Sequence, residues 1–307
     1  MITAQALSKR YGDKVAVDNI AFTVRPGVVT GFLGPNGAGK SSTMRLILGL
    51  DAPTSGTVTV NGKRYAEHRA PLREVGALLE ARSVHTGRTA YRHLLAQALT
   101  TGIPRRRVEE VIDLVGLREV ANRRAGGFSL GMGQRLGVAS ALLGDPATLI
   151  LDEPVNGLDP EGIRWIRNLM RALAAEGRTV FVSSHLMSEM SLTADHLIVI
   201  GKGRLIADTP VTEFVNRASR KTVRVRSPHT ARLRELLAGP RITVTSGEPG
   251  VLDIAGLPSA EIGRIACAHS VPLEELTPVR ASLEEAFMEL TQDAVEYRAE
   301  QPEAATR

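Results

Sequence analysis

A glycine-rich segment, Gly34–Ser42, carries the residue types that bind a polyphosphate. It reads Gly-Pro-Asn-Gly-Ala-Gly-Lys-Ser-Ser, and a glycine followed after four residues by Gly-Lys-Ser is the spacing of a phosphate-binding loop. Small residues let backbone N–H groups point at the anion, and the positive end of a following helix adds a favourable field. We expect Lys40 to bind the β- and γ-phosphates and Ser41 to give Mg²⁺ a hydroxyl ligand. The other loop residues expected to contact the nucleotide are Gly34, Asn36, Gly37, Ala38, Gly39 and Ser42.

Two adjacent carboxylates, Asp152 and Glu153, follow the apolar run Thr148–Leu151. A continuous apolar run of this kind is typical of a strand buried in a parallel sheet, and the carboxyl ends of such strands face the ligand crevice. Asp152 would then hold Mg²⁺ directly or through water, and Glu153 would orient or deprotonate the attacking water. The alternative is that the two acids cap a helix that starts near Pro160.

Two further side chains could reach the same nucleotide. His185 follows the apolar strand expected at 179–183 and could contact a γ-phosphate, although a histidine at a strand end is also often structural. Tyr11 precedes the phosphate loop and could stack on an adenine ring, or it could equally cover the edge of a sheet.

Strand and helix patterns surround these residues. The run 28–33 predicts a strand before the phosphate loop, and 44–48 has helical character after it. Short strands separated by glycine and proline turns are expected at 2–7, 21–24 and 58–60, where they would form an antiparallel sheet beside the nucleotide core. The pattern between the phosphate loop and Asp152 turns helical, which predicts a helical insertion with helices at 90–100, 108–115 and 130–143.

The composition is that of an ordinary globular chain of about two domains. The 307 residues carry 38 Lys and Arg against 33 Asp and Glu, a net charge of +5. The arginines are scattered with few aromatic residues among them, so no nucleic-acid partner is expected. Cys267 is the single cysteine, which excludes an internal disulfide. No signal-peptide pattern opens the chain and no apolar run approaches the roughly 18 residues that span a bilayer, so a membrane role would need a partner chain.

The ordered set of motifs resembles the nucleotide-binding subunits of ATP-binding-cassette (ABC) transporters over roughly residues 2–215. In that family two such subunits close head to tail, and the signature segment of one covers the ATP bound to the other. The resemblance implies that Ser129 and Gly131 bind the γ-phosphate in trans and that Asp159 belongs to the loop linking the two sites. It also implies that Glu153 is the catalytic base, that His185 is the switch histidine and that Lys40 completes the catalytic set. The resemblance is carried by Tyr11, Gly34–Ser42, Phe128–Arg135, Leu149–Pro154, Gly157-Leu158-Asp159 and His185.

Two places depart from the family pattern. Glu80 stands where the family usually has a glutamine that senses Mg²⁺, the attacking water and the membrane partner, and a carboxylate can ligate Mg²⁺ but cannot donate a hydrogen bond when ionised. The signature reads Phe-Ser-Leu-Gly-Met in place of Leu-Ser-Gly-Gly-Gln, so Leu130 and Met132 replace a glycine and a glutamine. The Ser-Leu-Gly-Met form most resembles the exporter branch that includes drug- and antibiotic-resistance subunits.

The pattern after Pro210 predicts a small α+β domain. Strands are expected at 223–226, 242–245 and 251–255, and helices at 231–237 and 260–268. Ser282 and Glu285 have the spacing of a capping box before an amphipathic helix. The region resembles the C-terminal extension of the same exporter subunits, which implies a role in dimerisation or in contact with the partner; the alternative is a module that adds stability.

The sequence therefore predicts an α/β fold: a P-loop NTPase core with a parallel sheet, an antiparallel β subdomain and a helical insertion at about 82–143, followed by a small C-terminal α+β domain. We place the domains at 1–215 and 216–295, with a disordered tail at 296–307. The expected function is a Mg²⁺-dependent ATPase that works as a homodimer on the cytoplasmic side of the cell membrane and powers export through a separate polytopic permease. Its cargo would be a drug, an antibiotic or a lipid-like molecule.

Two other functions stay open from the sequence. One is a non-transport ABC ATPase that acts on nucleic acid or the ribosome; such proteins usually carry paired cassettes or long coiled coils, whereas this chain has one phosphate loop and no sustained heptads. The other is an importer subunit, against which the signature variant and the C-terminal domain argue.

Overall fold

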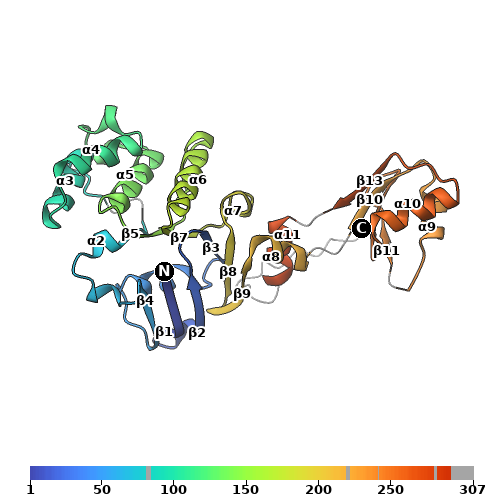
Figure 1. Cartoon of the computed structure of the whole chain (residues 1–307), viewed down its shortest axis with the longest axis horizontal. Helices are drawn as coiled ribbons and strands as arrows, with labels where there is room; N and C mark the ends of the chain where they lie inside the picture. Colours follow the sequence, from blue (N-terminus) through green and yellow to red (C-terminus); the bar gives the residue numbers. More distant parts are fainter. Residues whose placement is uncertain (81–83, 219–221, 241, 280–281, 292–307) are drawn as a thin grey trace, which may run out of the picture. The chain divides into compact units, whose positions relative to one another are not determined.

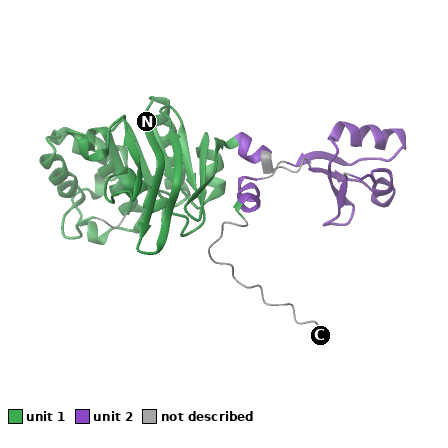
Figure 2. Cartoon of the chain, turned by 90° about the horizontal axis from the view of Figure 1, so that it is seen from below, with its two compact units in different colours: residues 1–211, 291–307 green, residues 212–290 purple. Residues whose placement is uncertain are grey.

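A computed structural model of the chain describes residues 1–80, 84–218, 222–240, 242–279 and 282–291. The described residues divide into two compact units, Met1–Val211 together with Thr291, and Thr212–Leu290 (Figure 2). The division falls at the start of helix α8 (Val211–Ala218), so residue 215, where a domain boundary was expected, lies inside that helix. The tail expected at 296–307 lies outside the described residues. None of the helices in the described part of the chain has the length and apolar content needed to cross a membrane.

A six-stranded sheet forms the centre of the first unit (Figure 1). Its order is β5-β6-β7-β3-β8-β9; neighbouring strands run parallel except β9, which is antiparallel to β8. All residues of β3 and β7 are buried, as expected for parallel strands covered on both faces. The parallel core predicted from the apolar runs is confirmed. The strands are β3 (Val29–Leu33), β5 (Val75–Leu78), β6 (Thr148–Asp152), β7 (Thr179–Ser183), β8 (His196–Gly201) and β9 (Arg204–Pro210).

Three helices return the chain between the core strands. Helix α1 (Lys40–Ile47) follows β3, α6 (Pro160–Ala175) lies between β6 and β7, and α7 (Met187–Thr193) lies between β7 and β8. Helix α6 is amphipathic and buries one stripe of apolar side chains. Because each parallel strand is followed by such a crossover, the carboxyl ends of β3, β6 and β7 meet at one edge of the sheet.

A three-stranded antiparallel sheet with the order β2-β1-β4 completes the sheets of the first unit. Its strands are β1 (Ile2–Tyr11), β2 (Lys14–Val24) and β4 (Ser55–Val60). The predicted antiparallel arrangement is confirmed, but β1 and β2 are longer than the apolar runs, because their pairing continues through polar residues to the hairpin turn. Phe22 of β2 lies 6.1 Å from Phe32 and 6.0 Å from Phe181 between ring centroids, so the two sheets share one apolar core.

Three helices follow β5 and precede β6 along the chain, and they lie together as one group (Figure 1). They are α3 (Ala90–Thr100), α4 (Arg105–Leu114) and α5 (Leu130–Leu142), and they confirm the helices predicted there. Helix α4 begins earlier than expected, because Pro104 is its N-cap residue and three arginines form its first turn. A short helix, α2 (Pro71–Glu74), precedes β5. Residues 81–83, where the insertion was expected to begin, lie outside the described residues.

The second unit contains a four-stranded antiparallel sheet with the order β11-β12-β10-β13. The apolar side chains of α9 and α10 pack with those of the sheet in one core cluster. Strand β13 was not predicted because Pro278 interrupts its pattern; the proline is tolerated because β13 is an edge strand. The elements are β10 (Thr222–Arg226), β11 (Thr243–Thr245), β12 (Val251–Ala255), β13 (Glu275–Val279), α9 (Thr230–Leu236), α10 (Ser259–Ala268) and α11 (Leu283–Thr291).

The predicted capping box opens helix α11. Ser282 Oγ accepts a hydrogen bond from the backbone N of Glu285 at 3.1 Å, and Glu285 Oε2 accepts one from the backbone N of Ser282 at 2.7 Å. The two side chains thus satisfy backbone donors at the helix start reciprocally, which confirms the capping pattern.

Candidate nucleotide-binding site

The glycine-rich loop joins the buried strand β3 to helix α1, which is the predicted strand-loop-helix arrangement. Two of its glycines are required by close packing. A Cβ at Gly34 would overlap the carbonyl oxygen of Ile200, and one at Gly39 would overlap that of Ala16. Gly39 also has a φ of 101°, which side chains disfavour. The loop is therefore packed against β2 and β8, and α1 begins at Lys40.

Lys40 is folded back onto this loop. Its Nζ donates to the carbonyl oxygen of Gly34 at 2.6 Å and to that of Pro35 at 3.2 Å, and the residue is only 8% exposed. Burial lowers the Lys40 pKa, while the carboxylates of Glu153 and Asp152 oppose that effect. The ammonium group is thus held by neutral carbonyls, which phosphate oxygens could replace as stronger, charged partners.

Ser41 and Asp152 bring oxygen ligands together at the end of β6. Ser41 Oγ donates to Asp152 Oδ2 at 2.9 Å, and Ser183 Oγ donates to the other carboxylate oxygen. Hydroxyl and carboxylate oxygens are donors that Mg²⁺ takes alongside phosphate and water, so this pair fits that ion. The described residues contain no group of three or more His, Cys, Asp or Glu suited to a metal. A bound Mg²⁺ would therefore depend on phosphate oxygens and water for its other ligands.

Glu153 and His185 form a second pair at the same sheet edge. His185 Nδ1 lies 2.7 Å from Glu153 Oε2, and the backbone N of His185 donates to that oxygen at 3.3 Å. Glu153 has a φ of 50°, an uncommon left-handed conformation for a residue with a side chain. Asp159 caps helix α6, since its Oδ1 accepts from the backbone N of Gly162 at 2.8 Å. The alternative in which Asp152 and Glu153 cap that helix is therefore wrong.

Tyr11 shares a cavity of about 380 Å³ with the phosphate loop and both acids. It is 45% exposed, and its hydroxyl donates to Asp51 Oδ2 at 2.7 Å. Lys14 also lines the cavity, although the sequence analysis did not predict it as a site residue. The one signal that could have indicated it is the rarity of lysine, which makes up six of the 38 basic residues. The lining residues are Tyr11, Lys14, Ala16, Asn36, Gly37, Ala38, Gly39, Lys40, Ser41, Ser42, Asp152 and Glu153.

Six predicted site residues do not line this cavity: Gly34, Glu80, Ser129, Gly131, Asp159 and His185. Ser129 caps helix α5, and its Oγ accepts from the backbone N of Met132 at 3.2 Å. Gly131 packs so closely that a Cβ there would lie 2.9 Å from the carbonyl oxygen of Gly157. A single chain thus carries a signature segment and a phosphate loop without bringing the two together.

Helix α5 nevertheless contacts the segment that carries the acids. Leu130 is 47% exposed and packs on Gly157, where a Cβ would overlap the leucine side chain. Gln134 is 3% exposed, and its Nε2 donates to the carbonyl oxygen of Glu153 at 2.9 Å. Sequence reasoning gave Gln134 no role; the only signal was a polar amide on a helix that is otherwise apolar on its buried face.

Glu80 lines a different cavity, a groove of about 510 Å³ formed by residues of α1, β5, α3 and α5. Arg45 and Gln97 are among its polar residues, and several leucines make its walls largely apolar. Glu80 is not among the residues that line the phosphate cavity, and its expected role as a Mg²⁺ ligand stays a prediction.

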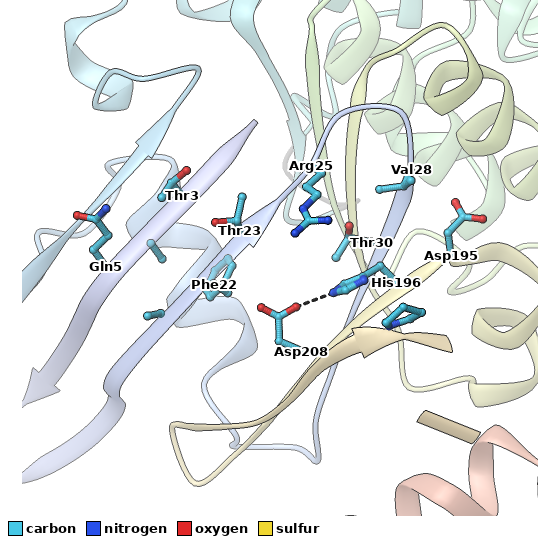
Figure 3. A pocket seen from close by; sticks show the side chains of 13 residues that line it. Thr3, Gln5, Phe22, Thr23, Arg25, Val28, Thr30, Asp195, His196 and Asp208 are labelled. Atoms are coloured by element: carbon cyan, nitrogen blue, oxygen red, sulfur yellow. Dashed lines mark hydrogen bonds and ion pairs between the residues drawn. The ribbon is translucent and has the colours of Figure 1, made fainter. Parts of the chain in front are cut away.

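A further cavity, of about 620 Å³, lies at the opposite end of the core strands (Figure 3). It is lined by Thr30 and His196, near the starts of β3 and β8, whereas the phosphate loop follows the end of β3. Arg25 points into it, and His196 Nε2 pairs with Asp208 Oδ1 at 2.6 Å. None of the predicted site residues lines this cavity.

Comparisons with known proteins show what this chain is similar to. A family model described as ABC transporter matches residues 17–156, and one described as a domain of unknown function matches residues 221–284. The bacitracin transport ATP-binding protein BcrA of Bacillus licheniformis is 41% identical over 220 residues, covering 71% of this chain and 72% of that protein. The Nod factor export ATP-binding protein I of Ralstonia nicotianae is 32% identical over 301 residues, covering 95% and 94%. A solved ATP-binding subunit of an ABC transporter superposes with a TM-score of 0.65 and 27% identity over 71% of this chain and 92% of that chain.

Proposed function

Because this chain belongs to the ABC transporter ATP-binding proteins, we propose that its ATPase activity drives export through a separate polytopic permease in the cell membrane. The subunit would lie on the cytoplasmic face, held there by the permease. The observation that carries the proposal is the convergence of Lys40, Ser41, Asp152 and Glu153 on one cavity. These are the residue types that phosphoryl transfer to water requires.

The phosphate loop would bind the ATP phosphates. Lys40 exchanges its two carbonyl partners for the β- and γ-phosphates, and the backbone N–H groups of the loop surround the anion. Ser41 and Asp152 would hold Mg²⁺, which neutralises charge on the transferring phosphoryl group. Tyr11 would stack on the adenine ring.

Glu153 would act on the attacking water. Its carboxylate lies at the edge of the cavity, where it can orient the water or take its proton. His185 already contacts that carboxylate at 2.7 Å, and in the ATP-bound state it would also contact the γ-phosphate. The charge that develops on the phosphoryl group is then stabilised by groups that are in place before the reaction.

The second half of the site would come from another copy of the chain. Ser129 and Gly131 do not line their own chain's cavity, and in a head-to-tail homodimer they would bind the γ-phosphate held by the partner. Asp159 would belong to the loop between the two sites. Two ATP molecules would then be buried between the copies, and hydrolysis would let the dimer reopen.

The groove beside Glu80 would receive a cytoplasmic segment of the permease. The largely apolar walls of the groove come from both the sheet core and the helical insertion. Movement of the helical insertion relative to the core would therefore change the shape of the groove. Glu80 at this groove would then sense the permease, in addition to its expected role as a Mg²⁺ ligand. For cargo we propose a drug, an antibiotic or a lipid-like molecule, because the two relatives named above are called bacitracin transport and Nod factor export proteins.

Removal of the Lys40 ammonium tests the assignment of the phosphate loop. We expect the purified protein to hydrolyse Mg-ATP, and Lys40→Ala to lose nucleotide binding, because no other described cation lies on the loop itself. Binding is measured by calorimetric titration of ATP, and hydrolysis by phosphate release. Lys63→Ala, an exposed change outside the cavity, is the control. Normal ATP binding by Lys40→Ala would contradict the assignment.

Purification of the tagged chain from its own membranes separates transport from the alternative function. Recovery of a polytopic membrane protein with the chain supports the exporter. Recovery of ribosomes or nucleic acid without such a protein would instead favour a non-transport ATPase.

A further inference from the structure

We propose that Gln134 is a positioning residue that connects the signature end of helix α5 to Glu153 of the same chain. The proposal rests on the function proposed above, in which Ser129 and Gly131 meet the ATP of a second copy. Gln134 lies on the same helix, less than two turns further on. One rigid helix would thus touch the partner's nucleotide at its start and this chain's own catalytic residue shortly afterwards.

The environment of Gln134 indicates that the role of its amide is to hydrogen-bond Glu153. Gln134 is buried, its Nε2 donates to the Glu153 carbonyl oxygen, and its Oε1 has no hydrogen-bond partner in the described part of the chain. An unpaired buried acceptor is unfavourable, and an apolar side chain of similar size would fill the space without one. Packing alone therefore does not explain a glutamine at this position, whereas the bond to Glu153 does.

The backbone of Glu153 needs such support. Its left-handed conformation, with a φ of 50°, persists only where surrounding contacts hold it. Ser183 Oγ accepts from the Glu153 N–H at 3.0 Å, His185 contacts its carboxylate, and Gln134 holds its carbonyl. The backbone N of Asn156 also donates to this carbonyl, at 3.2 Å. Without the Gln134 donor, the peptide group after Glu153 keeps only that longer bond, so the carboxylate would be held less firmly relative to the water.

A second contact joins the start of α5 to the same segment. Leu130 packs on Gly157, and a Cβ at Gly131 would lie 2.9 Å from the Gly157 carbonyl oxygen. When Ser129 and Gly131 close on the partner's ATP, α5 and the segment 153–159 would move as one packed body. Gln134 would then keep Glu153 in a fixed position relative to the signature end of α5 as the dimer closes.

The test replaces Gln134 by leucine and, as a second variant, by methionine, in the full-length protein. Both changes keep the volume and remove the donor. Thr148→Val is the matched control, because it also removes an unpaired buried polar group but lies at the far end of β6 from Asp152. We expect kcat for ATP hydrolysis to fall by on the order of tenfold to a hundredfold. The KM for ATP should stay within about twofold of the parent value, because the phosphate loop is unchanged.

A double variant, Gln134→Leu with Glu153→Gln, distinguishes a role in positioning Glu153 from a general loss of protein structure. If Gln134 acts through Glu153, Gln134→Leu lowers the small residual rate of Glu153→Gln no further. A further loss in the double variant, or a kcat of both Gln134 variants equal to that of Thr148→Val, would overturn the proposal while leaving the ATPase assignment intact. An inactive parent protein would overturn the proposed function itself, and this proposal with it.

Discussion

Three side chains beside the phosphate loop form a chain of hydrogen bonds that fixes Tyr11. Arg45 Nε and the Tyr11 hydroxyl both donate to Asp51 Oδ2, at 2.8 and 2.7 Å. These bonds lower the pKa of Asp51 to about 2, and the bond to Asp51 raises the pKa of Tyr11. Because the Asp51 pKa is lowered, the stabilisation is complete above its ordinary value of 3.8 and is lost only as the pH falls through about 2. Asp51 therefore stays an ionised acceptor for the Tyr11 hydroxyl at every physiological pH.

We predict that Tyr11→Ala weakens ATP binding by about 1–3 kcal/mol, because it removes the stacking surface for the base. Tyr11→Phe should bind almost as well as the parent protein, since it keeps the ring and loses only the bond to Asp51. Calorimetric titration of Mg-ATP measures both. Equal affinity in Tyr11→Ala would instead support the reading in which the ring only covers a sheet edge.

Among single residues, the sequence predicted those of the phosphate-binding loop, because their spacing follows from the geometry of a bound phosphate. The positions from Gly34 to Ser42, and the acids after an apolar strand, follow from local pattern and parallel-sheet topology. The bond from Gln134 to Glu153 could not be predicted, because it depends on how α5 packs against a segment 19 residues away. The location of Glu80 in a separate groove likewise depends on packing between β5, α1 and α3.

Helix α3 buries a histidine within the helical insertion. His93 is 7% exposed, its Nε2 lies 3.3 Å from Gln97 Nε2, and its Nδ1 is buried without a partner in the described part of the chain. Burial lowers the His93 pKa, and the positive charges of Arg88 and His85 lower it further. The folded chain therefore favours neutral His93.

This shift predicts that acid weakens the helical insertion. Since the His93 pKa in the folded chain is below its unfolded value of 6.5, the unfolded chain takes up the proton first, and stability falls as the pH drops below about 6.5. His93→Leu removes this proton uptake, so its stability should depend less on pH. Hydrogen exchange of the α3 amides at about pH 7.5 and pH 5, corrected for intrinsic rates, measures the effect. The same pH dependence in both proteins would contradict it.

Among the elements, periodic helices and β-rich apolar runs next to a motif were predicted well, whereas strand β5 was not. The helices α3 and α5 have a clear helical period, and the buried strands β3, β6 and β7 are apolar runs rich in β-branched residues or bounded by turn and motif residues. Strand β5 has four residues, and such short runs cannot be distinguished from helix by periodicity. Gly76 in this strand illustrates a constraint that the sequence pattern does not contain. A Cβ at this position would overlap the Ala141 carbonyl of α5, and this contact depends on how β5 packs against α5.

Under the proposed function, the chain carries two incomplete halves of one reaction site. The cavity at Lys40 contains the groups that bind and activate, whereas the signature residues on α5 lie elsewhere on the same chain. Under the proposed function this arrangement makes dimerisation a condition of catalysis, with ATP as part of the interface. All the described residues that line the phosphate cavity belong to the first unit.

Chemical cross-linking between the phosphate loop of one copy and the signature segment of another tests the proposed dimer most directly. Asn36→Cys and Leu130→Cys are introduced together into a Glu153→Gln, Cys267→Ser chain, so that ATP stays bound and the native exposed cysteine does not react. With Mg-ATP and a short bis-maleimide, we predict a covalent species of twice the 32.9 kDa chain mass, and much less of it without nucleotide or in the Lys40→Ala background. A chain that binds Mg-ATP but stays at 32.9 kDa would contradict the head-to-tail dimer on which the account depends.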